Sequence, residues 1–320
     1  MNRYSLFHVT EFAYDGPVSE SYNEVRLKPR QDASQSCLSF HLATEPAARA
    51  SAHQDPYGNW VHRFNVMPEH RHLRIEADSV VLVQEPPPLP SNGIALRELD
   101  AQSDALDEYY DLLTPSVYVP HLPAVRGLVA EAERESGGSV AGFVRAATSL
   151  VYMRFRYEKG ATHVHSSIED ALRTSAGVCQ DFAHLLLAML RMRGLPARYV
   201  SGYLVPLRAT EEGASVEEVI GGQASHAWTE VHLPGEGWFG LDPTMGRPAG
   251  KQHVRVAYGR DYGDAAPVRG IYKGHAGQRL SVDVRVRPAL DEEGHELLQE
   301  TAAGPVEAAP VQEPPQQQQQ

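Results

Sequence analysis

A proline-rich segment divides the chain into two parts whose hydrophobic patterns differ. The segment QEPPPLPSNG, residues 84–93, is too rich in proline to continue a helix or a central strand. Before it, β-branched and aromatic residues occur in short runs that are separated by turn residues. After it, apolar residues recur every three or four positions, as they do along one face of a helix. The sequence therefore predicts an N-terminal β-rich domain over residues 1–90 and a second domain over residues 91–290.

The first part has the pattern of an antiparallel, β-sandwich-like domain. Turn signals lie at Asp15-Gly16 and at Tyr57-Gly58-Asn59, where glycine and short polar side chains favour a chain reversal. We therefore expect several short strands between such turns. The strand-like runs are HVTEFAYDGPV at 8–18, NEVRLKPR at 23–30, QDPYGNWVHRFNV at 54–66 and HLRIEADSVVLV at 72–83.

The second part begins with helical patterns, so the whole chain is predicted to be an α+β protein. The helical runs are LRELDAQSDALDEYYDLL at 96–113, PAVRGLVAEAERES at 123–136 and SVAGFVRAATSLVYMRFRY at 139–157. Residues 91–140 can cover either domain on this pattern alone. The end of the chain, residues 291–320, is rich in proline and glutamine, and this composition predicts a disordered tail.

Charge and hydropathy disfavour several classes of protein. The formal charge of −12 at pH 7 argues against nucleic acid or an anionic membrane as the main partner. Neither a signal peptide nor a membrane span is visible, so we expect a cytoplasmic protein. In a reducing cytosol the two cysteines, Cys37 and Cys179, are expected to be free thiols. The sequence predicts no particular oligomeric state.

Histidine pairs do not complete a metal site in the sequence. His70 with His72, and His163 with His165, have the spacing that presents two imidazoles on one face of a strand. No cysteine or carboxylate cluster accompanies them at ligand spacing, and the glycine-rich turns lack the Lys-Ser/Thr of a phosphate loop. We therefore expect neither a metal ion nor a cofactor.

The segment GVCQDFAHLLLAMLRMRGLP, residues 177–196, places Cys179 at the start of an apolar helix. Its apolar residues from Phe182 onward share one helical face, and Gly194 followed by Pro196 ends the helix. The unpaired N–H groups of a first helical turn favour an anion, so they favour a thiolate and bind the oxyanion of an attacked carbonyl. The alternative is that Cys179 is a small buried hydrophobe.

A base and an orienting carboxylate for Cys179 are predicted on two later strands. The run ASHAWTEVHLP begins a strand with His226, and GEGWFGLDPT leads through a glycine-rich turn to a partner strand that ends at Asp242. In this arrangement His226 takes the proton of Cys179, and Asp242 fixes the imidazole tautomer. Considered separately, His226 is also explained as a polar strand residue and Asp242 as the start of a turn.

These segments together resemble the bacterial transglutaminase-like superfamily. The resemblance rests on GVCQDFAHLLLAMLRMRGLPARYVSGYL, ASHAWTEVHLPGEGWFGLDPT, VAYGRDYGDAAPVRG, YDGPVSESYNEVRLKPR and DPYGNW, and it extends over residues 3–288. It implies a papain-like fold, with the cysteine-bearing helix packed on an antiparallel sheet. It also implies Cys179 as nucleophile, His226 as base and Asp242 as third triad member. The chain has DPTMG and Ala265 where the family more usually has DPTNG and valine, and Met245 leaves the polar contacts beside the triad open.

Other side chains near these segments are weaker candidates. Tyr157 can supply a second oxyanion donor, and Gln180 follows the nucleophile directly, although tyrosine in a strand is commonly a packing residue. Trp228 lies on the strand face of His226 and can shield the imidazole from water, although packing alone explains an aromatic residue there. Asp181 suits the helix dipole, and His184 is expected to be a hydrogen-bonded structural residue.

A Cys-His-Asp triad implies acyl transfer from an amide through a thioester. Water as acceptor makes the protein a cysteine peptidase or amidase, and a primary amine as co-substrate makes it a transamidating enzyme. We expect a peptide or protein substrate in either case. The alternative is a catalytically silent binding or scaffold protein that uses the N-terminal β domain, because fold resemblance does not prove activity.

Overall fold

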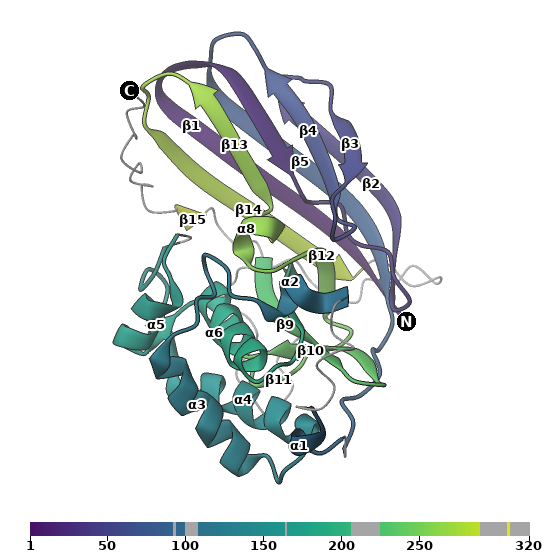
Figure 1. The fold of residues 1–320 in the computed structure, drawn as a ribbon. Helices are drawn as coiled ribbons and strands as arrows, with labels where there is room; N and C mark the ends of the chain where they lie inside the picture. Colours follow the sequence, from purple (N-terminus) through teal and green to yellow (C-terminus); the bar gives the residue numbers. More distant parts are fainter. Residues whose placement is uncertain (92–93, 100–107, 164, 206–224, 289–305, 308–320) are drawn as a thin grey trace, which may run out of the picture.

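The computed structural model of the protein describes residues 1–91, 94–99, 108–163, 165–205, 225–288 and 306–307. A strand-rich region lies at one end of the molecule and a mixed helix and strand region at the other (Figure 1). This is the α+β architecture that the sequence predicted. Within the described ranges, no helix has both the length and the apolarity needed to cross a membrane.

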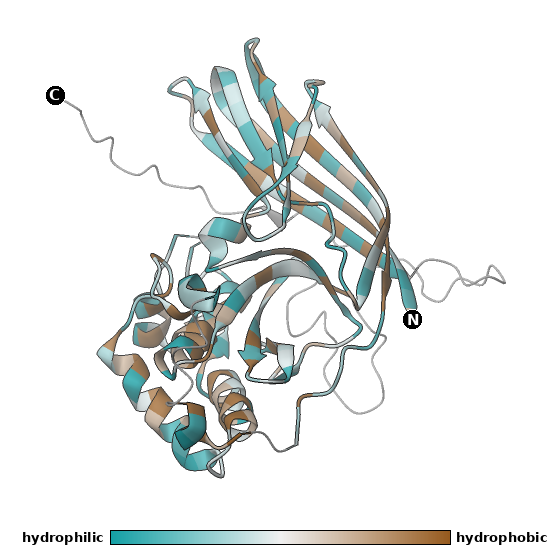
Figure 2. Cartoon of the chain, turned by 45° about the vertical axis from the view of Figure 1, so that its right-hand side comes forward, coloured by the Kyte–Doolittle hydropathy of each residue, from teal (hydrophilic) through white to brown (hydrophobic). Residues whose placement is uncertain are grey.

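The strand-rich region is built around one long strand, β1 (Asn2–Val25). The first part of β1 pairs with β5 and β14, and its last part pairs with β4 and β13. Hydrophobic and hydrophilic residues alternate along these strands (Figure 2), and side chains such as Val25, Phe64 and Ile75 form the core of the region. Its other strands are β2 (Gln35–Glu45), β3 (Ser51–Gln54), β4 (Trp60–Val66), β5 (His70–Val83), β13 (Val268–Lys273), β14 (Gln278–Pro288) and β15 (Val306–Glu307).

The turn that the sequence predicted at Asp15-Gly16 is wrong, because β1 continues through these residues. The backbone N–H of Asp15 donates to Gly277 O at 3.1 Å, and the pairing of β1 with β5 shifts register between Ala13 and Val18. Pairing with β14 on one side and β5 on the other therefore keeps the Asp-Gly pair within β1, where it forms an irregularity of the strand instead of a turn. The turn at Tyr57-Gly58-Asn59 is present between β3 and β4, and Gly58 has a φ of 72° there.

The last strands of the described core return to the N-terminal sheet. Strands β13 and β14 lie in the range that the sequence assigned to the second domain, 91–290, yet both pair with β1. Residues 268–288 therefore complete the N-terminal region, because their backbone hydrogen bonds are satisfied there. Of the predicted tail, 291–320, only the short strand β15 at 306–307 lies within the described residues, and it pairs with β14.

The second region consists of helices packed on a curled antiparallel sheet. The helices predicted at 123–136 and 139–157 are α3 and α4, whereas residues 100–107 of the run at 96–113 lie outside the described residues. The helices are α1 (Leu96–Leu99), α2 (Tyr110–Leu113), α3 (Pro123–Glu135), α4 (Val140–Arg154), α5 (Ile168–Thr174), α6 (Cys179–Met192) and α8 (Tyr262–Ala265). The strands are β6 (Arg156–Tyr157), β7 (Ala176–Gly177), β8 (Ala197–Leu204), β9 (Ser225–Leu233), β10 (Gly237–Asp242), β11 (Arg247–Pro248) and β12 (His253–Gly259).

Helix α6 is the centre of this region because it is buried on nearly all sides. Its residues from Gln180 to Arg191 are all buried, and they share one apolar core with residues of α3, α4, β8 and β9. The sheet has the order β11-β10-β9-β8-β12. Strand β9 is its middle strand and is buried on both faces, with Ala227 and Val231 against α6 and Trp228 in a separate cluster on the other face.

The two regions meet through an apolar contact and a polar clamp. Leu6 and Val81 of the first region form one buried cluster with Tyr203 and Val254 of the second. Asn59 then clamps the backbone of Tyr258: its Oδ1 accepts from the N–H and its Nδ2 donates to the carbonyl, both at 2.7 Å. The clamp satisfies polar groups that the contact removes from water.

Candidate active site

Cys179 is the first residue of α6, as the sequence predicted, and its surroundings are held by Asp181. The Asp181 carboxylate accepts from Val178 N–H at 2.8 Å and from the Thr162 hydroxyl at 2.5 Å. Burial raises the pKa of Asp181, while these two donors oppose that change. Asp181 therefore connects the start of the helix, where Cys179 lies, to the loop that contains Thr162.

Glycine is required at position 177, two residues before the candidate nucleophile. A Cβ atom there would lie 2.7 Å from Oδ2 of Asp181. Gly177 also pairs with Tyr157 in the short parallel contact of β7 with β6, and Glu158 N–H donates to Gly177 O at 2.9 Å. The close approach of the Asp181 carboxylate and the β6 strand thus explains the glycine in the GVC sequence.

The structure brings His226 and Asp242 together from neighbouring strands. His226 is the second residue of β9, and Asp242 is the last residue of β10, which pairs with β9 in antiparallel orientation. Nε2 of His226 lies 2.8 Å from Oδ2 of Asp242, and both side chains are fully buried. Because a carboxylate only accepts hydrogen bonds, His226 donates through Nε2.

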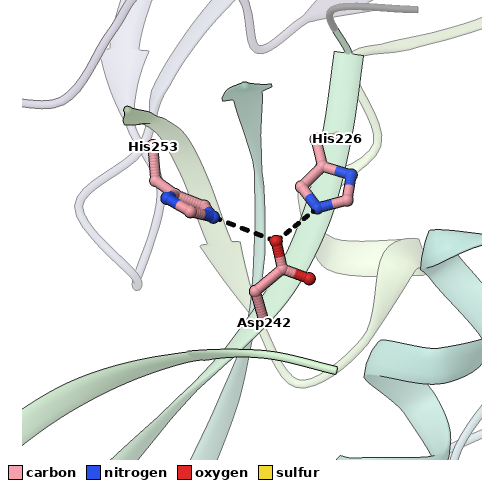
Figure 3. Close-up of side chains that lie close together, drawn as sticks. All are labelled: His226, Asp242 and His253. Carbon is pink, nitrogen blue, oxygen red and sulfur yellow. Dashed lines mark hydrogen bonds and ion pairs between the residues drawn. The ribbon is translucent and has the colours of Figure 1, made fainter. Parts of the chain in front are cut away.

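A second histidine, His253, contacts the same carboxylate oxygen (Figure 3). Nε2 of His253 lies 3.0 Å from Oδ2 of Asp242. The other oxygen, Oδ1, accepts from the backbone N–H groups of Thr244 at 2.9 Å and Met245 at 3.2 Å. Asp242 therefore accepts four hydrogen bonds. His253 was not among the residues predicted from the sequence, although a histidine near the start of an apolar strand is a signal that it shares with His226.

Burial and charge act in opposite directions on the His226–Asp242 pair. Burial alone lowers the pKa of His226, but the Asp242 carboxylate and the Cys179 side chain raise it, to about 10. Burial alone raises the pKa of Asp242, but His226 and His253 together hold it well below its usual value. The pair thus favours an imidazolium beside a carboxylate, which is the charge state that a neighbouring thiolate requires.

The other ring nitrogen of His226, Nδ1, has a different environment from Nε2. Nδ1 of His226 is buried and has no hydrogen-bond partner among the described residues. The Cys179 side chain nevertheless contributes to the raised pKa of His226, so the two groups are neighbours. With Nε2 donating to Asp242, a neutral His226 carries its lone pair on Nδ1. The ring can therefore accept the thiol proton through that atom.

Trp228 lies over both histidines from a position two residues along β9. Its ring stacks on His226 with centroids 6.2 Å apart and meets His253 edge-on at 5.1 Å. Gly202 on β8 makes room for it, since a Cβ at 202 would lie 2.5 Å from the indole. The fully buried indole keeps water from the histidine rings on this side. This is the placement that the sequence predicted for Trp228.

Tyr157 and Gln180, the other sequence candidates, both lie close to Cys179. Burial raises the pKa of Tyr157, and the Cys179 side chain adds to that change. Tyr157 and Met245 pack against the buried Leu204. Met245, at the position where the family more usually has asparagine, thus adds an apolar side chain beside Tyr157. Gln180 is buried next to Cys179 at the start of α6.

His184, one turn further along α6, has a structural environment. It is fully buried, and its Nε2 accepts from Tyr262 N–H at 3.1 Å. Burial lowers its pKa to about 3, so the ring is neutral and uncharged. Tyr118 stacks on it with ring centroids 5.5 Å apart. His184 thus joins α6 to the start of α8.

His226, Asp242 and His253 form the one set of converging ligand-type side chains found among the described residues. Two imidazoles and a carboxylate are a donor set that zinc accepts. Hydrogen bonds already account for these atoms: Nε2 of each histidine is directed at Oδ2 of Asp242, and Nδ1 of His253 accepts from Gly250 N–H at 3.1 Å. The donor set is thus explained as an acid and base cluster.

Comparisons with known proteins match both regions. Residues 4–82 match the family model described as the bacterial transglutaminase-like N-terminal region, and residues 127–243 match that of the transglutaminase-like superfamily. The second range contains Cys179, His226 and Asp242, whereas His253 lies beyond its end.

Relatives extend this match over most of the chain. An uncharacterized protein of Mycobacterium leprae is 36% identical over 289 residues, which cover 89% of this chain and 99% of that protein. An uncharacterized protein of Mycobacterium tuberculosis is 36% identical over 301 residues, covering 90% and 93%. A structure from Cytophaga hutchinsonii, described as a "putative cysteine protease", has the same fold, with a TM-score of 0.68, 23% identity and coverage of 93% and 94%. The chain therefore belongs to the transglutaminase-like superfamily and carries the bacterial transglutaminase-like N-terminal region.

Proposed function

We propose that the protein transfers acyl groups from an amide of a peptide or protein through a thioester on Cys179. The Cys179 thiolate attacks the amide carbonyl, and the C–N bond breaks as His226 gives its proton to the leaving amine. Water or a primary amine then attacks the thioester and gives its proton to His226, and the C–S bond breaks to release the Cys179 thiolate. Water gives an acid, and an amine gives a new amide.

The environment of His226 carries this proposal. The ring is fully buried, Nε2 lies 2.8 Å from Oδ2 of Asp242, and Nδ1 has no hydrogen-bond partner among the described residues, while Cys179 is a neighbour of the ring. His184 also has one bonded and one unpaired ring nitrogen, but its partner is a backbone N–H and its ring is uncharged, whereas the partner of His226 is a carboxylate. An imidazole that moves a proton requires one fixed nitrogen and one available nitrogen, which is the arrangement of His226.

The start of α6 supplies the oxyanion site in this proposal. The first N–H groups of a helix have no partner within the helix, and Cys179 is the first residue of α6. A carbonyl attacked by Cys179 develops its negative charge beside these donors and beside Tyr157. Tyr157 keeps its proton at neutral pH because its pKa is raised, so its hydroxyl can donate.

Alkylation of Cys179 as a function of pH tests the nucleophile. Iodoacetamide should modify Cys179 well below the ordinary thiol pKa of about 8.5, because the imidazolium of His226 stabilises the thiolate. Peptide mapping by mass spectrometry follows both cysteines in one sample, so Cys37, whose pKa is raised by burial, is the internal reference. The substitution His226→Ala should return Cys179 to ordinary thiol behaviour.

The outcome of this titration separates the enzyme from a silent scaffold. If Cys179 reacts no faster than Cys37 at pH 6, or if His226→Ala changes nothing, the proposal is wrong and a binding role is favoured. If Cys179 is activated, peptide amides offered with and without a primary amine distinguish hydrolysis from transamidation by the mass of the product. Cys179→Ala must abolish either reaction. Fractionation of cells tests the cytoplasmic location that belongs to this proposal.

A further inference from the structure

We propose that His253 is a positioning residue that limits how strongly Asp242 attracts the proton of His226, a role that rests on the proposed acyl transfer. The observation behind it is that His253 and His226 share one oxygen of the Asp242 carboxylate. Their Nε2 atoms lie 3.0 Å and 2.8 Å from Oδ2. The relevant chemistry is the acidity of the imidazolium that must protonate the leaving amine.

The hydrogen bonds of His253 fix its tautomer. Its Nδ1 lies 3.1 Å from Gly250 N, and a backbone N–H can only donate, so Nδ1 is the acceptor. The ring proton is therefore on Nε2, where it is donated to Asp242. Burial lowers the pKa of His253, although Asp242 opposes this, and the ring is neutral. His253 thus adds a donor to the carboxylate and no net charge.

Several contacts hold His253 in place. Its backbone N–H also bonds to Gly250 O, at 2.9 Å, so the 250–253 turn holds both the main chain and the ring. Trp228 contacts the ring edge-on. The charged and titratable groups that act on it are Asp242, His226 and Arg247, of which only Asp242 attracts a proton to the ring. A ring held in this way cannot turn its donor away from Oδ2.

Sharing Oδ2 weakens the hydrogen bond that His226 makes to the same oxygen. Each donor withdraws part of the negative charge of the carboxylate, so each of two donors meets a less negative oxygen than a single donor would. Without His253, Asp242 would hold the His226 proton more strongly. An imidazolium that binds its proton too strongly is a poor general acid, and the amine would leave more slowly. The reaction thus depends on a donor that touches neither substrate nor thiol.

Two substitutions separate the donor from the bulk of the ring. His253→Gln keeps an N–H group at nearly the position of Nε2, and His253→Met keeps the volume and loses the donor. In His253→Met we expect the NMR titration midpoint of the His226 ring to rise and kcat to fall about 10-fold at unchanged KM. In His253→Gln both should return to near the wild-type values. If His253→Met does not fold, His253→Asn, whose amide is too short to reach Asp242, replaces it.

A matched control is His8, another buried histidine with two hydrogen bonds, to Tyr203 and Thr10, both at 2.9 Å. His8→Gln should leave the His226 midpoint unchanged. The proposal is overturned if the midpoint does not move in His253→Met, or if His253→Gln behaves like His253→Met. The titration needs no turnover, so it tests His253 even if wild-type protein transfers no acyl group. If the enzyme is active but the titration midpoint of His226 does not change when His253 is substituted, this role of His253 is refuted and the proposed function is still supported.

Discussion

Two buried carboxylates lie on the curled sheet, and their partners differ in kind. Asp242 is bonded by two histidines, His226 and His253, whereas Glu230 on β9 is bonded by two arginines, Arg198 and Arg255. Asp242 is fully buried and the Glu230 side chain is 4% exposed, so both are removed from water. The difference is that a histidine can gain or lose a proton, whereas an arginine stays charged.

Arginine suits a structural role because its guanidinium stays charged. Arg198 donates to Oε2 of Glu230 at 2.6 Å, and Arg255 donates to Oε1 at 2.9 Å. Arg255 also donates to the Ser34 hydroxyl at 2.8 Å, and Arg198 stacks on Tyr258 at 3.6 Å. Glu230 therefore joins β9 to the N-terminal region through Arg255, while the Asp242 cluster on the same sheet is the one to which we assign proton transfer in the proposed reaction.

Asp242→Asn should have the largest effect, because it removes the charge that holds His226 in its working tautomer. We expect kcat to fall by about 10⁴-fold with the fold retained, as occurs when the orienting carboxylate of a triad becomes an amide. Single-turnover kinetics on a peptide amide measures the acylation step. A loss smaller than tenfold would remove Asp242 from the mechanism and make the two carboxylates equivalent.

Glu230→Gln should lower stability and spare the chemistry. Two partly buried guanidinium groups lose their counter-charge, and we expect the free energy of unfolding to fall by about 3–5 kcal/mol. Urea denaturation measures this, and kcat of the folded fraction should remain nearly unchanged. The control is Asp170→Asn in an exposed pair with Arg173 at 3.0 Å, where the loss should stay below about 1 kcal/mol. Equal losses in the two variants would contradict the structural role of Glu230.

The histidine cluster should make stability depend on pH on the alkaline side of neutrality. The pKa of His226 is raised from an ordinary value of about 6.5 to about 10. The stability from the ion pair is fully present below pH 6.5 and is lost as the pH rises toward 10, when the folded ring also loses its proton. The decrease should be on the order of a few kcal/mol. It should be absent in His226→Gln and retained in Glu230→Gln.

Acid should also weaken this ion pair, through protonation of Asp242. The pKa of Asp242 is depressed in the folded protein, so its contribution is present above the unfolded value of about 3.9. That contribution is lost as the pH falls below about 3.9, because the unfolded chain then binds a proton that the folded carboxylate does not bind. Urea titrations at pH 3 to 7 measure it. A wild-type profile that Asp242→Asn leaves unaltered would contradict this linkage.

Asn59→Ala should have the smallest effect. It removes the clamp on the Tyr258 backbone and the acceptor of Arg30 at 2.7 Å, leaving polar groups unpaired at the contact between the regions. We expect a loss of about 1–3 kcal/mol in the free energy of unfolding. Urea denaturation measures it, and Asn65→Ala, at a strand position with an exposed side chain, is the control. A loss of stability as large as that of Glu230→Gln would mean that Asn59, and not Glu230, makes the main polar contribution to the contact between the two regions.

The local sequence pattern was sufficient to predict those elements whose structure depends on neighbouring residues. The helix that begins at Cys179 follows from its continuous apolar residues and its Gly194 stop, and the strands of His226 and Asp242 follow from short runs joined by a glycine-rich turn. Because β9 and β10 are consecutive, their residues had to be neighbours. The order of the three predicted residues and the elements that carry them were therefore readable from the chain.

The local sequence pattern gave wrong or incomplete predictions where pairing with a strand distant in sequence determines the structure. The Asp15-Gly16 pair has the composition of a turn, but hydrogen bonding to the far segment at Gly277 keeps β1 extended there. Residues 268–288 follow the core in sequence, yet they complete the N-terminal sheet. Neither outcome is encoded within a window of neighbouring residues, because the stabilising hydrogen bonds come from residues more than two hundred positions away.

The sequence by itself determined the family, the α+β architecture and the elements that carry Cys179, His226 and Asp242. Only the tertiary structure decided that His253 shares the carboxylate of Asp242. The two residues lie on β12 and β10, which β8 and β9 separate in the sheet, and curling of that sheet brings the rings to one oxygen atom. The physical reason is that spacing along a chain fixes which face of a strand a side chain occupies, whereas the curvature of a sheet depends on the packing of all its strands together.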